Sequence, residues 1–268
     1  MRRHSRVELE YHNAMGTEVI DPQSIRNVTI IGDPEATTRV VHRLTRRPAG
    51  PRSGTATTIR WADHTIRLTQ LSSQEPLATL EHSLRVADGV VAVMNAAAPR
   101  APRLETILRV ADDHQVARLC LVTGLDHPAA DFDRCVRTIA GTHGAVPLTL
   151  QIPHGIGAGF AGVIDLVRMG DLAPMGAEFY GSHWQVAEQW YRRLVTAVTD
   201  HRDNDPGPPE VSPEQVSDRV RRLTHVGDAA PVLCDPAPWS DVAPLLDAVI
   251  CYLPSPLHVC QPEHVLDW

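Results

Sequence analysis

The sequence contains no lysine, because all 25 basic residues among its 268 residues are arginine. This absence excludes chemistry that needs a primary amine, such as a Schiff base, an amine nucleophile or the lysine of a phosphate-binding loop. Long apolar runs are also missing, and none approaches the roughly 18 residues that a membrane-spanning helix needs. No hydrophobic signal segment follows the charged N-terminus. We therefore expect a cytoplasmic protein without a membrane anchor.

The remaining composition is typical of a soluble globular domain. Apolar residues make up 43% of the chain, charged residues 21%, and the formal net charge is −7. An acidic chain of this kind is a poor candidate for binding DNA, whose phosphates attract basic surfaces. The five cysteines show no C-x-x-C spacing, which favours reduced thiols over a disulfide framework.

Strand-like and helix-like segments alternate regularly from about residue 25. The alternation and the continuously apolar strands predict an α/β fold, with a mainly parallel sheet covered by helices on both faces. The expected strands are Asn27–Ile31, Thr55–Trp61, Thr65–Gln70, Val90–Met94, Arg118–Thr123, Val146–Ile152 and Pro231–Cys234. The expected helices are Ala36–Leu44, Leu77–Ala87, Leu104–His114, Phe132–Thr142 and Ser240–Tyr252.

The pattern changes in residues 155–228, which we predict to be an inserted α+β subdomain. A glycine-rich stretch leads to an expected strand, Val163–Met169. Ser182 and Gln185 have the spacing of a capping box that opens a long helix to His201. Ser212, followed by Pro213, is expected to cap a second helix. The predicted organisation is a flexible lead-in (1–24), a main domain (25–154 and 229–259), the insert (155–228) and a tail (260–268).

Several segments of the chain resemble the nucleotide-binding (G) domain of bacterial elongation factor G, a translational GTPase. The resemblance runs from about Ile25 to Val259 and includes the inserted subdomain, whereas the downstream domains of the factor have no counterpart. It implies a P-loop NTPase-like three-layer sandwich. The segments that carry it are SIRNVTIIGD, HSLRVADGVVAVMNAAA, GAVPLTLQIPHG, FAGVIDLVRM and PVLC…PLLDAVICYLPSPLHV.

The segment that aligns with the phosphate-binding loop departs from the family pattern. Such a loop needs glycine-rich backbone, a lysine for the phosphates and a hydroxyl on Mg²⁺. The chain has Gly32-Asp33-Pro34-Glu35-Ala36-Thr37-Thr38-Arg39, which lacks the second glycine and the lysine. Pro34 removes an N–H donor, and Asp33 and Glu35 add negative charge. Of the groups that such a loop uses to bind phosphate and Mg²⁺, only Gly32 and the hydroxyl of Thr37 or Thr38 remain.

The other nucleotide-binding elements of the family are degraded as well. The first switch shortens to the loop Arg46–Gly54, with Pro51 in place of the Mg²⁺-binding threonine. The second switch aligns with Thr69-Gln70-Leu71-Ser72-Ser73 and loses its carboxylate, glycine and histidine. The base-specificity motif becomes Thr123-Gly124-Leu125-Asp126, which keeps only Asp126, and the late loop near the guanine becomes Asp235-Pro236-Ala237.

These losses predict a degenerate GTP-binding site, or pseudo-GTPase, without a bound cofactor. Charge-assisted hydrogen bonds contribute roughly 1.5–3 kcal/mol each, so losing three or four removes about 5–10 kcal/mol. The remnant nucleotide site consists of Gly32, Thr37, Thr38 and Asp126, although Asp126 also suits a plain helix cap or loop carboxylate. Two alternatives stay open: residual GTP or GDP binding without hydrolysis, and an enzyme of specialised metabolism rebuilt in the vacated cleft.

No catalytic or metal site emerges from the remaining polar residues. Ser72 and Ser73 with Glu75 and His82 lack the surroundings of a nucleophile elbow, and Asp112 and Asp113 are expected to be ordinary solvated positions. A zinc site is an unfavoured alternative, because the spacing C-x6-H-x-C-x3-H does not match the common structural pattern. Its ligands would be Cys251, His258, Cys260 and His264.

The aromatic residues of the insert indicate a protein partner. Trp184 and Tyr191 fall on one stripe of the long helix and are expected to pack on the insert's own sheet. Trp190 lies off that stripe, so we expect it to be exposed. The resemblance implies that the insert contacts the ribosome, through its stalk protein.

Overall fold

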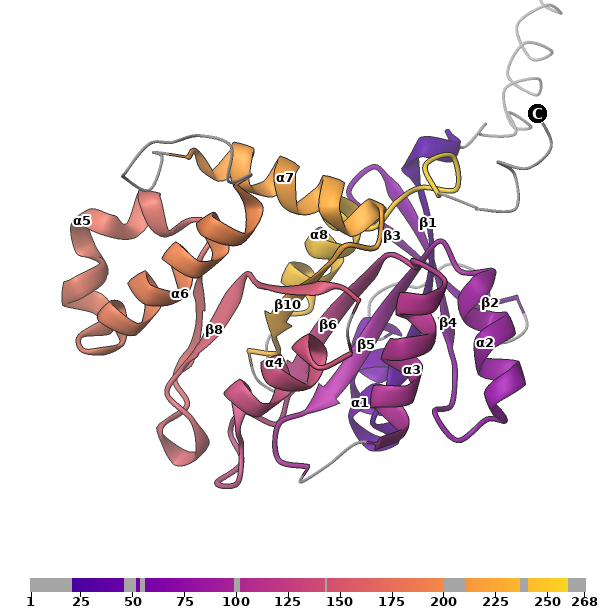
Figure 1. Cartoon of the computed structure of the whole chain (residues 1–268), viewed down its shortest axis with the longest axis horizontal. Coiled ribbons are helices and arrows are strands. Elements are labelled where there is room, and N and C mark those ends of the chain that lie inside the picture. Colours follow the sequence, from indigo (N-terminus) through magenta and orange to yellow (C-terminus); the bar gives the residue numbers. More distant parts are fainter. Residues whose placement is uncertain are drawn as a thin grey trace, which may run out of the picture.

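The computed structural model describes residues 21–45, 52–53, 56–98, 102–142, 144–199, 211–236 and 241–259. Its centre is an eight-stranded sheet with the order β2-β3-β4-β1-β5-β6-β10-β7 (Figure 1). The strands from β4 to β7 in this order run parallel, and β2 and β3 are antiparallel additions at one edge. The strands are β1 (Ile25–Gly32), β2 (Arg52–Ser53), β3 (Ala56–Trp61), β4 (His64–Gln70), β5 (Gly89–Asn95), β6 (Arg118–Thr123), β7 (Val146–Thr149) and β10 (Ala229–Cys234).

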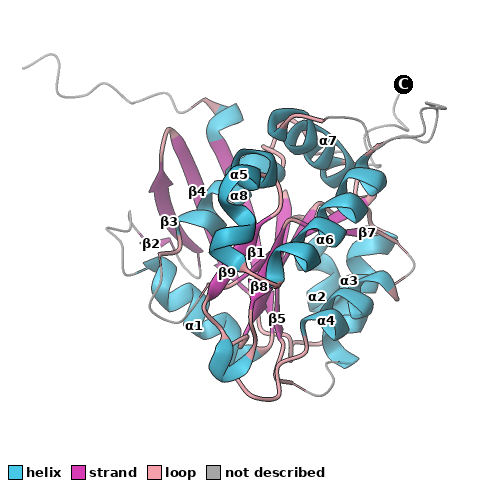
Figure 2. Cartoon of the chain, turned by 90° about the vertical axis from the view of Figure 1, so that its left-hand side faces the viewer, coloured by secondary structure: helices cyan, strands magenta, loops and turns pink. Residues whose placement is uncertain are grey.

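Helices cover both faces of this sheet, which confirms the predicted three-layer α/β sandwich. Consecutive strand residues point to opposite faces, so the fully buried Ile30 and Ile31 belong to different hydrophobic clusters. Figure 2 shows α1 and α8 on one side of the sheet and α2, α3 and α4 on the other. These helices are α1 (Pro34–Thr45), α2 (Leu77–Arg85), α3 (Pro102–Asp113), α4 (Phe132–Ala140) and α8 (Ala243–Tyr252).

The single strand predicted over Val146–Ile152 is wrong, because this apolar run serves two sheets. β7 ends at Thr149, and β8 (Gln151–His154) pairs in antiparallel fashion with β9 (Gly162–Asp165) in a separate two-stranded sheet. Leu150 lies between them and donates its N–H to the carbonyl of Val232 in β10 at 3.0 Å. The small sheet therefore begins before residue 155.

The predicted strand Val163–Met169 is too long at its end. β9 stops at Asp165, whose side chain accepts the backbone N–H of Val167 at 2.9 Å and turns the chain. A helix absent from the sequence-based expectation, α5 (Met169–Tyr180), follows and packs against α6 (His183–Val198). Both helices lie at the β7 end of the sheet, away from β2–β4 (Figure 1).

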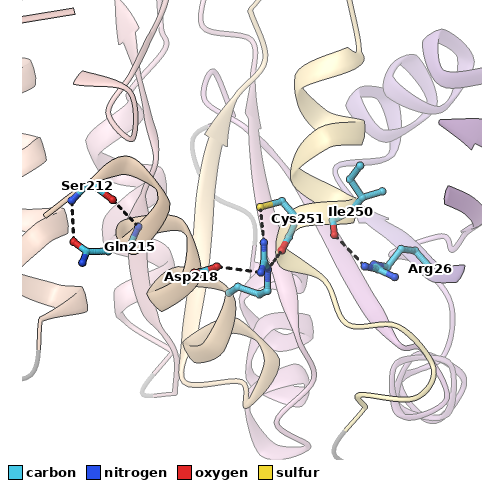
Figure 3. Close-up of polar contacts among 7 residues, drawn as sticks. Arg26, Ser212, Gln215, Asp218, Ile250 and Cys251 are labelled. Carbon is cyan, nitrogen blue, oxygen red and sulfur yellow. Dashed lines mark hydrogen bonds and ion pairs between the residues drawn. The ribbon is translucent and has the colours of Figure 1, made fainter. Parts of the chain in front are cut away.

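The capping box forms at Ser212, not at Ser182 at the start of α6. Ser182 adopts a helical conformation and makes no side-chain cap bond, so the prediction there is wrong. Ser212 and Gln215 exchange the reciprocal capping bonds that open α7 (Pro213–His225), and Pro213 occupies its first turn as predicted (Figure 3).

Two arginines anchor the C-terminal end of α8, where carbonyls lack partners within the helix. Arg26 of β1 donates to the carbonyl of Ile250 at 3.1 Å, and Arg221 of α7 donates to that of Cys251 at 2.7 Å (Figure 3). These bonds connect α7 and β1 to the last helix. Within the described residues, no helix is both long and apolar enough to cross a bilayer.

Candidate functional site

The connection between β1 and α1, where the phosphate-binding loop would lie, is a single residue, Asp33. Its carboxylate accepts the N–H of Ala36 at 2.9 Å, and its carbonyl accepts the N–H of Thr37 at 2.8 Å. Asp33 is therefore the N-cap of α1. The N–H groups at a helix N-terminus attract anions, but here the carboxylate of Asp33 already accepts a hydrogen bond from one of them. The one-residue connection is also too short to surround a phosphate group.

Gly32 is the retained glycine of the phosphate-loop segment, but the packing of the backbone explains its presence without any role in phosphate binding. Its φ is +151°, and a Cβ placed on it would lie 2.0 Å from the carbonyl oxygen of Val93 in β5. Only glycine tolerates so close an approach of two backbones. The packing of β1 against β5 therefore accounts for this residue.

The two candidate Mg²⁺-binding hydroxyls lie in different surroundings. Thr37 is 2% exposed, and its hydroxyl has no hydrogen-bond partner among the described residues. Thr38 is exposed and donates its hydroxyl to the carbonyl of Pro34 at 2.8 Å, while accepting the Gln70 amide at 3.3 Å. The hydroxyl of Thr38 is thus already engaged within the chain.

The segment aligned with the second switch is held in place by α3. Arg103 donates to the carbonyls of Ser73, at 2.7 Å, and Glu75. Ser73 is buried, and the hydroxyl of Ser72 accepts the N–H of Gln74 at 3.2 Å. In the part of the chain that the structure describes, no hydrogen bond joins either serine to the exposed His82, so no Ser–His pair is assembled.

At the aligned base-specificity motif, backbone geometry explains the missing lysine. Gly124 has a φ of +69°, and a Cβ there would lie 2.6 Å from the side-chain oxygen of Asn95. Thr123 is buried and donates its hydroxyl to the carbonyl of Met94 at 3.2 Å. Asp126 follows as an exposed carboxylate. A larger residue in place of Gly124 would be strained at this φ, and the side chain of Asn95 would have to move aside.

An arginine that was not among the predicted site residues forms an ion pair with Asp235. The Nη2 atom of Arg43, near the end of α1, lies 2.5 Å from the Oδ2 atom of Asp235, the residue after β10. The two side chains are only 15% and 14% exposed. The pKa of Asp235 is raised above its usual value, chiefly because the carboxyl group is buried. The hydrogen bond and charge of Arg43 oppose this rise, and the charge of Asp126 adds to it. The side chain of Arg43 therefore lies at the edge of the sheet where β10 ends.

A small pocket adjoins this ion pair. Its volume of about 20 Å³ has room for about one water molecule. Its polar lining residues are Arg43, Gln151, Asp235 and Asp241, and its apolar ones include Val242 and Leu245.

The described members of the candidate zinc set have other partners. The Sγ atom of Cys251 accepts a bond from Arg221 at 3.5 Å (Figure 3), and His258 bonds through Nδ1 to the hydroxyl of Ser255 at 2.8 Å. Cys260 and His264 lie outside the described residues. Within the described ranges, no three His, Cys, Asp or Glu side chains are grouped so that they could hold a metal ion.

The expected exposure of Trp190 is wrong, because its ring packs on the main domain. It meets Phe132 of α4 edge-to-face at 6.0 Å, and Arg193 lies over the ring at 5.0 Å. Trp184 stacks with Tyr180 of α5. The large apolar side chains described as exposed on α5 and α6 are Met175 (61%), Phe179 (79%) and Val186 (45%).

Comparison with known proteins supports the fold. No protein-family model matches the chain. A crystal structure of a protein from Thermus thermophilus matches it with a TM-score of 0.67 and 17% sequence identity, over 87% of this chain and 41% of that one. The chain thus spans about two fifths of the length of that protein. At this identity the likeness shows the fold alone.

Proposed function

We propose that this protein is a pseudo-GTPase that works by binding a protein partner rather than by hydrolysing GTP. One observation carries the proposal: the phosphate-binding loop is replaced by a one-residue connection in which Asp33 caps α1. A phosphate approaching this helix would meet a carboxylate where a G domain offers N–H groups and a lysine. Gly124, which stands where the base-specificity motif of the family has its lysine, removes a second contact.

The proposal predicts that guanine nucleotides do not bind at millimolar concentration. Calorimetry with GTP and GDP in the presence of Mg²⁺ should show no binding heat, because the missing contacts weaken a micromolar site by about 5–10 kcal/mol. The melting temperature at 1 mM nucleotide should stay within about 1 °C of that without ligand.

Asp126→Asn supplies the matched control for nucleotide binding, since Asp126 is the one retained base-recognising residue. The variant should behave like the wild type in both assays. A stabilisation by 0.1 mM GTP that disappears in Asp126→Asn would contradict the proposal and favour residual nucleotide binding.

For the partner, we propose the ribosome, contacted through the exposed apolar surface of α5 and α6. Support comes from the resemblance and from the exposure of Phe179 (79%), Met175 (61%) and Val186 (45%) on these two helices, since exposed apolar groups of this kind are typical of interaction sites. If this is correct, the protein should co-sediment with ribosomes, and Phe179→Ser should weaken the affinity about tenfold or more.

Val86→Ser is the control for the ribosome experiment, because Val86 is 63% exposed but belongs to the main domain. This variant should bind as the wild type does, and ribosomes stripped of the stalk protein should lose binding. Retention of binding by stripped ribosomes would exclude the stalk, and equal losses in both variants would exclude the insert surface.

A further inference from the structure

We propose that His225 is an acid-sensitive latch, which holds the segment leaving α8 against the end of α7 while its imidazole is neutral and releases that segment on protonation. His225 is the last residue of α7. The segment that it holds, the exit segment, consists of residues 253–259 and follows α8 directly. Neither a nucleotide nor the ribosome takes part in this latch.

The exit segment is a folded part of the domain. Leu253 is 1% exposed, and a Cβ placed on Gly89, at the start of β5, would lie 3.0 Å from its side chain. Ser255 is buried as well, and its hydroxyl bonds to Nδ1 of His258 at 2.8 Å. The segment therefore packs at the edge of the sheet where β5 begins, and its release would expose apolar and polar groups together.

Two guanidinium groups are fixed where the exit segment begins. Arg221 precedes His225 by four residues, so both side chains lie on one face of α7. Arg221 donates through Nε to the carbonyl of Cys251 at 2.7 Å, and Arg26 donates to the carbonyl of Ile250 at 3.1 Å (Figure 3). Because hydrogen bonds hold both guanidinium groups at the end of α8, neither charge can move away freely.

The imidazole of His225 is placed so that a second proton on the ring is unfavourable. Its Nε2 atom is shielded from solvent and has no hydrogen-bond partner among the described residues. A neutral imidazole leaves one ring nitrogen without a proton, whereas a protonated imidazole carries an N–H on both. Protonation would therefore place a charge and an unpaired N–H in a shielded position, which is costly.

The charges around His225 act in the same direction. The pKa of His225 is lowered from 6.5 to about 4, chiefly by burial and then by the charges of Arg221, His258 and Arg26. A hydrogen bond with the backbone of Leu253 opposes this change, but it is the smallest of these influences. The folded protein therefore favours the neutral imidazole.

The carboxylates near these arginines have other partners. Asp218 is 62% exposed and pairs with Arg221 at 3.1 Å. Asp88 accepts a hydrogen bond from the side chain of Asn27 at 2.6 Å. Among the described groups that shift the pKa of His225, none is a carboxylate. A positive charge on this ring would thus have no acidic partner.

The remaining titratable groups nearby add no negative charge in acid. Cys251 and Tyr252 both act on Arg221, but a thiol and a phenol are uncharged at acidic pH. Burial, followed by the charge of Arg26, lowers the pKa of His64, so this ring also brings only positive charge when it is protonated. Acidification therefore increases the repulsion at the end of α7.

The direction of the pH dependence follows from these pKa values. Well above pH 6.5 the imidazole is neutral in the held and the released form, so the latch stays closed. Between about pH 6.5 and pH 4 a released imidazole takes up a proton and the held one does not, so the released fraction rises as the pH falls. Because His225 is only half-buried, we expect about a tenfold rise between pH 7 and pH 5, less than the full shift would give.

Hydrogen exchange of the wild-type protein, corrected for the intrinsic exchange rate at each pH, tests the latch. The amides of Leu253 and His258 bond to the carbonyls of Val249 and Ser255, so a peptide covering residues 250–259 reports the release. Its protection should fall about tenfold from pH 7 to pH 5. Protection of β5, in the middle of the sheet, should change by less than about twofold.

His225→Gln supplies the decisive variant, because glutamine is polar but stays neutral at both pH values. The exit segment of this variant should be protected equally at pH 7 and pH 5, within about twofold. His82→Gln is the matched control, since His82 is exposed on α2. It should lose protection of the exit segment in acid as the wild type does. If His225→Gln does not fold, His225→Asn provides the same comparison.

Two results would overturn the proposal. If the exit segment of His225→Gln loses protection in acid as much as that of the wild type, another group is responsible. If β5 of the wild type loses as much protection as the exit segment, acid loosens the whole domain and no local latch exists.

Discussion

Replacement of Asp112 by alanine is expected to lower the free energy of unfolding by about 3–5 kcal/mol. The sequence pattern marked Asp112 as an ordinary solvated position, but its side chain is 6% exposed and forms an ion pair with Arg118, which is 1% exposed. The Oδ1 atom of Asp112 also accepts the N–H of Ala145 at 3.0 Å. Alanine would leave a buried guanidinium without its partner. Urea unfolding followed by circular dichroism measures the change.

The neighbouring Asp113 provides the control for this variant, because it is exposed. Asp113→Ala should change the unfolding free energy by no more than about 0.5 kcal/mol. Replacing both partners by apolar residues, as in Asp112→Leu with Arg118→Met, should recover most of the loss, since no charge is left unpaired. A loss below about 1 kcal/mol in Asp112→Ala would show that the pair is not buried as described.

The second large effect is expected for Gly32→Ala, which should destabilise the protein by about 3–5 kcal/mol. A methyl group at this position would lie 2.0 Å from the carbonyl oxygen of Val93, and the φ of +151° is unfavourable for alanine. Overpacking and backbone strain each cost about 1–3 kcal/mol. β1 lies inside the sheet between β4 and β5, so little room exists for it to move. Thermal and urea unfolding both report the loss.

Gly159→Ala is the control, because a methyl group there would meet nothing within 4 Å. It should be neutral within about 0.5 kcal/mol. The destabilisation of Gly32→Ala should be the same with and without GTP. A variant that stays as stable as the wild type would indicate that Gly32 is not required by the packing of β1 against β5.

The alternation of apolar strands and amphipathic helices was enough to predict the three-layer sandwich. Local signals succeeded where one residue's own chemistry decides the outcome, as for Ser212 and Pro213 at the start of α7. They failed for α5, whose glycines and proline weaken a helix prediction although the helix packs against α6. They also failed at Leu150, because periodicity within a continuous apolar run does not reveal which sheet each residue joins.

The missing parts of the candidate site could be predicted from the residues alone. It has no lysine for a phosphate or beside Asp126, and it has acidic residues in the first loop. The groups that take their places became visible only in the folded chain: the carboxylate of Asp33 caps the start of α1, and Arg43 pairs with Asp235. A missing lysine can be read within one segment, because the motif that needs it is short. The contact between Arg43 and Asp235 joins residues 192 positions apart, so it depends on the strand order that brings them together.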